Sequence, residues 1–153
     1  MNVRLRSAPP SDEVYYPESD GKPMAENTLQ YLWIETLHGN LTFWFRDSPD
    51  VLIAADNLIY PVQGDFSITA APDVYVAFGR PQGHRGSYKV FEEGGIFPQV
   101  VFEILSPTNE LRDLLDKFQF YQQYGAQEIY WPPDRPWPAP PRRACSRPPS
   151  PVF

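Results

Sequence analysis

An apolar run in the second half of the chain carries a single acid. Residues 99–105 are apolar at almost every position, as in a strand that is covered on both faces of a sheet. Glu103 interrupts the run. A lone buried carboxylate is costly unless it is paired or bound to a cation. Glu103 therefore reaches water at a sheet end, pairs with a structural Arg or Lys, or belongs to a functional site.

A second acid opens another predicted strand. Residues 71–78, Ala-Pro-Asp-Val-Tyr-Val-Ala-Phe, have the apolar character of a strand, and Asp73 stands near its start, directly after a proline. Two strands that each carry one acid are unusual enough to favour a functional site over two unrelated surface residues. This pair organises the interpretation of the remaining chain.

A helix follows the strand that contains Glu103. Thr108 or Asn109 is a suitable N-cap, and Gly125 is a suitable stop after Tyr124. The apolar residues expected to face the core from this helix, its core stripe, are Leu111, Leu114, Leu115, Phe118 and Tyr121. Lys117 lies at the rim of this stripe, where it can lean over the edge of the sheet. Its ordinary structural role would be a pair with Asp113 at the i,i+4 spacing.

The other segments are assigned from periodicity and turn residues. Apolar spacing predicts a first helix over residues 24–38 that ends at Gly39-Asn40, with Glu26 in its first turn, where the helix dipole alone favours an acid. Residues 41–45 are compatible with a short strand or with an extension of this helix. The remaining predictions are strands at 51–53, 56–60 and 127–131, and a surface loop at 81–93.

Length and composition limit the class of protein. A chain of 153 residues forms one domain with a real core. One Cys excludes a disulfide framework within the chain, and the two histidines, His38 and His84, show no zinc spacing. We expect a cytoplasmic protein, because there is no long apolar run and no signal-peptide core at the N-terminus.

Charge and proline content divide the chain. Residues 1–131 hold nine Lys and Arg against 18 Asp and Glu, an acidic balance that does not favour nucleic-acid binding by bulk electrostatics. Residues 132–153 hold nine prolines and four arginines and offer little to bury. We therefore predict an N-terminal arm over residues 1–18, a folded domain over 19–131 and a disordered tail over 132–153.

Four motifs in the same order resemble the Uma-type family of putative restriction endonucleases, within the PD-(D/E)xK nuclease superfamily. The motifs are Tyr-Pro-Glu-Ser-Asp-Gly-Lys-Pro-Met-Ala-Glu at 16–26, Ala-Pro-Asp-Val-Tyr-Val at 71–76, Arg-Gly-Ser-Tyr-Lys at 85–89 and Val-Val-Phe-Glu-Ile-Leu-Ser at 100–106. The resemblance implies an α/β fold with a restriction-endonuclease-like core, in which helices flank a central mixed β-sheet. It also implies Mg²⁺-dependent hydrolysis of DNA phosphodiester bonds, with Mn²⁺ as a substitute.

The resemblance assigns roles to four residues. Asp73 and Glu103 match the metal-binding positions, and Glu26 matches an acid that some members contribute. Carboxylate oxygens suit a hard divalent cation, which activates water and neutralises charge on the phosphate. The usual lysine, two residues after the Glu, is replaced by Leu105. Lys117 is then the candidate catalytic lysine.

Two hypotheses about function remain open. The first is a metal-dependent DNA endonuclease that acts as a homodimer, since one small nuclease needs two active sites to cut both strands. The second is a catalytically impaired relative that acts as a binding or assembly module. The missing strand lysine, the acidic balance and the unusual tail favour the second hypothesis, whereas the three acids favour the first.

Overall fold

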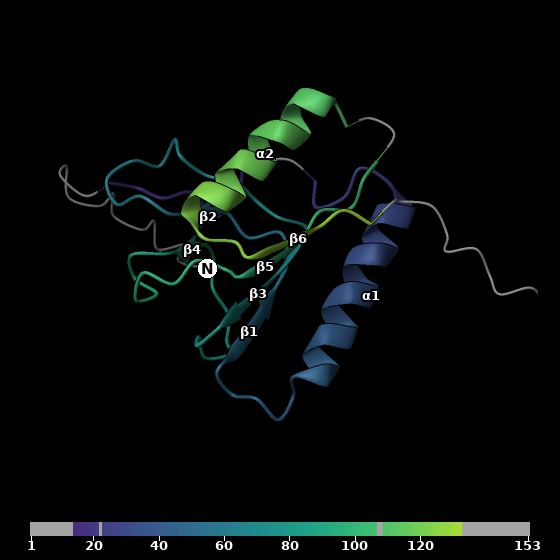
Figure 1. Ribbon diagram of the computed structural model, residues 1–153, viewed down its shortest axis with the longest axis horizontal. Helices are drawn as coiled ribbons and strands as arrows, with labels where there is room; N and C mark the ends of the chain where they lie inside the picture. The colour runs from purple at the N-terminus through teal and green to yellow at the C-terminus, as the bar shows by residue number, and fades with distance from the viewer. Residues whose placement is uncertain (1–13, 22, 107–108, 133–153) are drawn as a thin grey trace, which may run out of the picture.

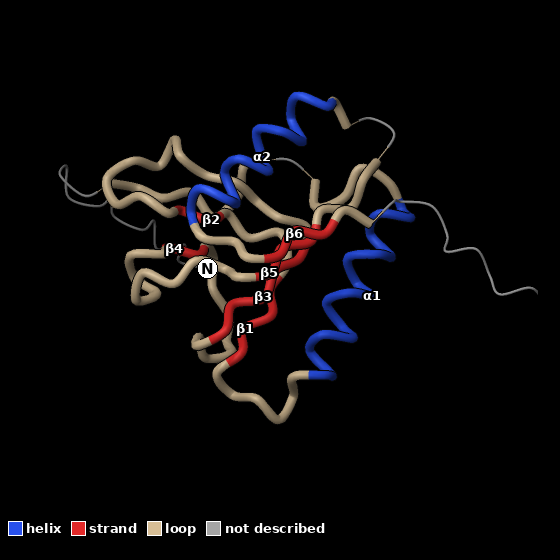
Figure 2. The backbone as a smooth tube through the Cα atoms, in the orientation of Figure 1, coloured by secondary structure: helices blue, strands red, loops and turns tan. Residues whose placement is uncertain are grey.

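The computed structural model describes residues 14–21, 23–106 and 109–132. In chain order its elements are α1 (Thr28–Trp44), β1 (Val51–Ala54), β2 (Ile59–Tyr60), β3 (Val74–Phe78), β4 (Tyr88–Lys89), β5 (Val100–Phe102), α2 (Leu111–Tyr124) and β6 (Glu128–Tyr130). Long loops join the short strands (Figure 2). The expected tail, apart from Pro132, and most of the expected arm lie outside the described residues.

A four-stranded mixed sheet forms the centre of the fold. Its order is β1-β3-β5-β6, with antiparallel pairing of β3 to both β1 and β5 and parallel pairing of β5 to β6. The inner strand β3 is buried at four of its five positions, as its apolar sequence predicted. The central mixed sheet expected from the sequence is confirmed.

The two helices cover opposite faces of this sheet (Figure 1). On one face Tyr75 and Val101 pack in a core that includes Tyr121 of α2, together with β2 and β4. On the other face their neighbours Val74 and Phe102 pack with Ile34 of α1. This division follows from the alternation of side chains along a strand.

Helix α1 extends beyond its predicted end. It begins at Thr28, with the side chain of Asn27 accepting a hydrogen bond from the Gln30 N–H at 2.9 Å, and it continues through Gly39 to Trp44. The predicted stop at Gly39-Asn40 was wrong. A helical glycine costs only about 1 kcal/mol relative to alanine, and packing of Leu41 on the core offsets this cost.

Helix α2 ends at Gly125 as predicted, at a φ of 121° that favours glycine. Its start and its buried face differ from the prediction. Glu110 is the N-cap residue, whereas the side chain of Asn109 accepts from the Ser106 N–H at 2.6 Å. Thr108, the other candidate cap, lies outside the described residues.

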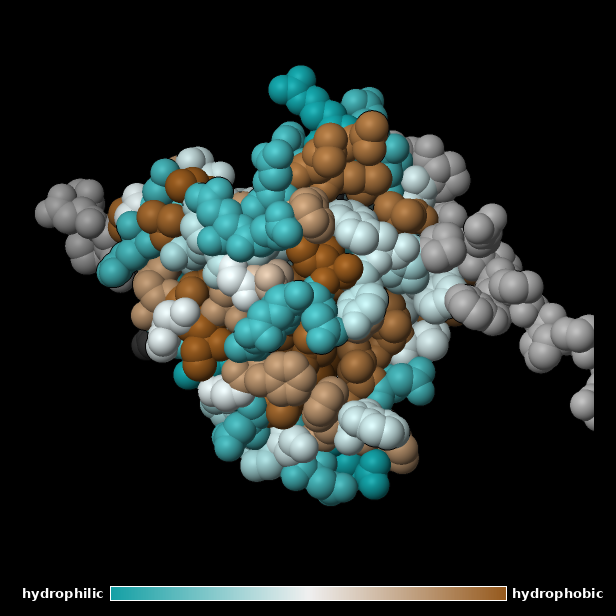
Figure 3. Space-filling view, in the orientation of Figure 1, coloured by the Kyte–Doolittle hydropathy of each residue, from teal (hydrophilic) through white to brown (hydrophobic). Residues whose placement is uncertain are grey.

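The core stripe predicted for α2 was wrong at three of its five residues and right at Tyr121, which is fully buried, and Leu114, which is partly buried. Leu111, Leu115 and Phe118 are 74%, 51% and 36% exposed, and Figure 3 shows hydrophobic side chains at the surface over the N-terminal half of α2. Beside Tyr121, the face turned to the sheet carries the partly buried Lys117, which the sequence placed at the rim of the stripe. Apolar residues occur on both faces of α2, so spacing alone could not select the buried one.

The segment predicted as a surface loop at 81–93 contains β4. This strand pairs in parallel with β2 in a separate two-stranded sheet. Tyr88 is fully buried there, and its hydroxyl donates to the Ile96 carbonyl at 2.8 Å. The Gly-rich, charged sequence concealed this single deeply buried residue.

Candidate metal-binding and catalytic site

Three acids lie near the ends of three neighbouring strands. Continuing the β3–β5 register by one residue places Asp73 opposite Glu103. Two residues beyond the last β1–β3 pair, Ala54 with Tyr75, the chain reaches Asp56, whose N–H donates to the carbonyl of Pro72, the neighbour of Asp73, at 3.2 Å. Directly opposed residues of a sheet point to the same face. Asp73 and Glu103 therefore share the face covered by α2, and Asp56 lines the same cavity as these two acids.

Asp73 is oriented by groups from both sides of the sheet. Its Oδ2 accepts from the Ile104 N–H at 2.6 Å, and its Oδ1 lies 3.5 Å from Nε2 of Gln30 on α1. Burial raises the pKa of the Asp73 carboxyl above its ordinary value, and the hydrogen bond from Ile104 and the charge of Lys117 oppose this rise. A cation would favour the charged form of this carboxyl.

Glu103 is held through both of its oxygens by α2. Nζ of Lys117 lies 2.7 Å from Oε2, and the hydroxyl of Tyr121 donates to Oε1. Burial raises the pKa of Glu103 to about 7, because the attraction of Lys117 only partly offsets the cost of burial and the repulsion of Asp73. The predicted position of Lys117 over the sheet edge thus leads to Glu103 and not to Asp113.

Glu26 reaches the same region from outside α1. It precedes the N-cap Asn27, so the expected place in the first turn of the helix was wrong. Its Oε2 accepts from the Ser106 hydroxyl at 2.6 Å, and its charge contributes to the raised pKa of Asp73. Glu26 is therefore a neighbour of these acids.

Asp56 is the residue that the sequence interpretation missed. It has a φ of 53°, the one positive value of a described residue other than glycine. Although the residue is exposed overall, partial burial of its carboxyl and the charges of Asp20 and Asp73 raise its pKa. The available signal was an acid directly after the apolar run that begins at Val51, the same pattern as Glu103.

These groups line a cavity of about 550 Å³. Six acids line it, and Lys117 is the one cationic side chain among its described lining residues. The acids are Asp20, Glu26, Asp56, Asp73, Glu103 and Asp113. Such a lining repels an anionic substrate unless a cation is present.

The donor set fits a hard divalent cation through two carboxylates. Across residues 14–21, 23–106 and 109–132, no group of three or more Asp, Glu, His or Cys side chains is arranged so that it could hold a metal ion. Mg²⁺ is commonly held by one or two protein carboxylates, with water and substrate phosphates as its other ligands. Asp73 and Glu103 satisfy this requirement, and the three-carboxylate set with Glu26 is not preformed.

Comparison with known proteins relates this chain to putative nucleases. A crystal structure of a putative nuclease of the DUF820 group from Anabaena variabilis is similar in fold, with a TM-score of 0.54 and 14% sequence identity. The alignment covers 73% of this chain and 60% of that one, so the chain spans about three-fifths of the length of that protein. No curated protein matches.

The model of the Uma2 family, described as putative restriction endonuclease, matches residues 13–138. The chain therefore belongs to this family, and its fold is nuclease-like. The match begins close to the first described residue and continues beyond β6 into the expected tail. Among the described residues, neither helix is long and apolar enough to cross a membrane.

Proposed function

We propose that this protein is a divalent-metal-dependent endonuclease that hydrolyses DNA phosphodiester bonds. The observation that carries the proposal is the direct opposition of Asp73 and Glu103 across β3 and β5, with Lys117 in contact with the second acid. Buried carboxylates in this arrangement are costly without a cation. The family supports a nuclease-like role, whereas the metal dependence and DNA as the substrate are our inference.

In this proposal each side chain has a separate task. Asp73 and Glu103 hold Mg²⁺ or Mn²⁺, which when bound supplies an activated water and offsets the negative charge of the phosphate. Lys117 presents an ammonium group beside Glu103, from which it orients water or donates a hydrogen bond to a phosphate oxygen. Tyr121 fixes the direction of the Glu103 carboxylate.

A catalytically impaired binding module is the second candidate. It is favoured by the 2.7 Å ion pair, in which the ammonium group of Lys117 is already bound to the Glu103 carboxylate. It is also favoured by leucine at position 105, where the family usually has the strand lysine. In this alternative the lysine permanently balances a buried acid and is not available to a substrate. In the first candidate the protein cleaves DNA and Lys117 takes part, whereas in the second it does not cleave and Lys117 only balances the buried charge of Glu103.

Nicking of supercoiled plasmid by the purified protein in Mn²⁺ tests the proposal. We expect cleavage by the wild type and loss of cleavage in Asp73→Ala, Glu103→Ala and Lys117→Ala. If, of the three variants, Lys117→Ala alone still cleaves, the lysine has no role in the mechanism and the two acids keep theirs. Absence of cleavage by a wild type with a folded circular dichroism spectrum would favour the impaired module.

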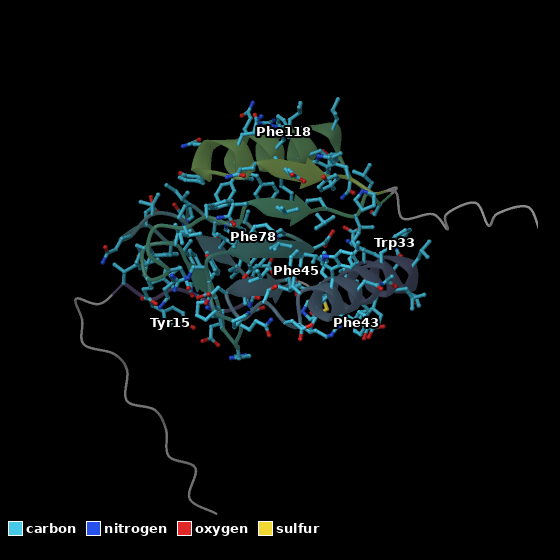
Figure 4. All side chains as sticks on the ribbon, turned by 60° about the horizontal axis from the view of Figure 1, so that its bottom comes forward. Tyr15, Trp33, Phe43, Phe45, Phe78 and Phe118 are labelled. Carbon is cyan, nitrogen blue, oxygen red and sulfur yellow. The ribbon has the colours of Figure 1, made fainter. Side chains whose placement is uncertain are left out.

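A homodimer in the cytoplasm completes the proposal. Cleavage of both strands of a duplex requires two active sites. The exposed Leu115 and Phe118 on α2 offer an apolar surface for a second copy, and Figure 4 shows Phe118 on this helix. Light scattering at micromolar concentration should give the mass of a dimer. A monomer mass would contradict this part of the proposal.

A further inference from the structure

A second cavity of about 500 Å³ lies beside the acidic one, and the mechanism above does not use it. Met24 lines both cavities. The segment after β1 lies between them, because Ala55 and Asn57 line the second cavity whereas Asp56 and Leu58 line the first. A nucleic-acid strand whose phosphate lies at Asp73 therefore has this cavity within reach of an adjoining nucleotide.

The second cavity has an apolar floor and a polar rim. The floor is formed by Ile34 from α1, together with Ile53, Ala54 and Ala55. Both histidines of the chain, His38 on α1 and His84 in the loop before β4, line the cavity, although they are far apart in sequence. An imidazole that lines a cavity can serve as a stacking partner for another planar ring.

The loop that carries His84 is held in place by its neighbours. Nε of Arg85 lies 2.7 Å from Oε1 of Glu93, and its other nitrogens donate to the carbonyls of Gly83 and Pro81, both at 2.9 Å. The Asn57 side chain donates to the Arg85 carbonyl, also at 2.9 Å. This wall of the cavity is therefore formed before any ligand binds.

The charges at the rim disfavour a phosphate group as the ligand. The guanidinium of Arg85 is committed to the bonds of its own loop. Glu35 contributes a carboxylate, which repels an anion, and its Oε1 accepts from the Tyr31 hydroxyl at 2.6 Å. A carboxylate can accept further hydrogen bonds. The rim therefore suits an uncharged ring that carries an N–H donor.

We propose that the cavity between α1 and the loop at 83–85 binds one unstacked nucleobase next to the hydrolysed phosphodiester, with the Glu35 carboxylate accepting from the exocyclic amino group of the base. The inference rests on the proposed function and narrows its substrate. A base enters such a cavity from a single strand or after it leaves the stack of a duplex. Cytosine meets the requirement, because its N4 amino group donates to a carboxylate.

The test compares short single-stranded oligodeoxycytidine with oligodeoxyuridine of equal length. Cytosine carries an amino group at position 4 and an acceptor nitrogen at position 3, whereas uracil carries a carbonyl oxygen at position 4 and an N–H donor at position 3, so the comparison tests whether the carboxylate requires the exocyclic amino group. Fluorescence anisotropy is measured in Ca²⁺, after a gel shows that the oligonucleotide is intact. The variants are Glu35→Ala and His84→Ala. Glu128→Ala is the matched control, because Glu128 on β6 is also an exposed carboxylate that accepts from a tyrosine hydroxyl, at 2.5 Å.

We expect the wild type and Glu128→Ala to bind the cytidine probe about tenfold more tightly than the uridine probe, as for a hydrogen bond to a charged group. Glu35→Ala should bind both probes equally. His84→Ala should weaken both by about fivefold or more, as for the loss of a stacking ring. Equal binding of the two probes by the wild type, absence of binding to either probe, or a preference that persists in Glu35→Ala would overturn the inference.

Thermal stabilisation by Mn²⁺ separates this inference from the proposed function. A wild type that Mn²⁺ stabilises, but that does not distinguish the two probes, overturns the base-binding cavity and leaves metal-dependent hydrolysis in place. A wild type that prefers the cytidine probe, but that Mn²⁺ does not stabilise, supports the cavity and counts against the metal site.

Discussion

Lys117 on α2 and Glu103 at the end of β5 form an ion pair of 2.7 Å in which the carboxylate is almost fully buried. The ammonium group of Lys117 thus balances the negative charge of Glu103, a task that a bound divalent cation could also perform. Whether the cation replaces the ammonium group or joins it determines how this site works. The predictions below separate the tasks of the residues around this pair.

Asp73→Asn should abolish stabilisation of the protein by Mg²⁺ or Mn²⁺. An amide keeps the shape of the side chain and removes the charge that holds the cation. Differential scanning fluorimetry should show a melting temperature that rises with the logarithm of metal concentration in the wild type and stays constant in the variant. Asp47→Asn, at an exposed position beside Arg46, should behave like the wild type. An equal metal response in both variants would remove Asp73 from the site.

Lys117→Met should lower the rate of plasmid nicking by about 100-fold or more, the usual range for a positioned acid or base. Metal-dependent stabilisation should remain, because Asp73 and Glu103 are retained. Lys89→Met, which removes a partly buried lysine paired with Glu92 outside the acidic cavity, provides the control. A Lys117→Met protein that nicks plasmid at the wild-type rate would exclude a catalytic role for this lysine.

Tyr121→Phe should destabilise the fold by about 1–3 kcal/mol, because Glu103 loses a hydrogen bond inside the core. Urea denaturation measures this change, and isothermal titration with Mn²⁺ should show weaker binding because the carboxylate is less constrained. Tyr130→Phe removes an equivalent bond to Glu128 at the surface. Its effect on stability should stay within about 0.5 kcal/mol. Equal losses in the two variants would contradict a positioning role for Tyr121.

Metal affinity should increase as the pH rises toward and past 7. The pKa of Glu103 is raised to about 7 in the folded protein, so the folded state binds this proton more tightly than the unfolded state does. The metal-free protein should therefore lose stability between about pH 4.5 and 7, whereas stabilisation by Mn²⁺ should grow over the same interval. Urea denaturation across this range tests both effects. Glu103→Gln should flatten both dependences, and Glu92→Gln should leave them unchanged.

Asp56→Asn should weaken Mn²⁺ binding by about tenfold or less, without abolishing it. Asp56 adds negative charge beside Asp73 but lies one strand away from Glu103. Asparagine tolerates the positive φ at this position, so the fold should be preserved. Isothermal titration measures the affinity, with Asp47→Asn as an exposed control. Complete loss of binding would make Asp56 a direct ligand.

The sequence by itself determined the central sheet and its pair of acids. An acid inside or next to an apolar strand is visible in the chain because burial and strand alternation are local properties of the pattern. Asp73 and Glu103 were identified in this way, and Gly125 was recognised as the end of α2 because a left-handed turn favours glycine.

Only the tertiary structure decided which side chains meet. The pairing of β1 with β3 brought Asp56 beside the other acids, and the rotation of α2 turned Lys117, in place of Leu115 and Phe118, toward the sheet. Helix rotation, strand register and the proximity of distant loops depend on packing summed over the whole core. No local stretch of sequence contains that sum, which is why Asp73, Glu103 and Lys117 could be named from the sequence, whereas the position of Asp56 and the contacts of Lys117 and Tyr121 with Glu103 could not.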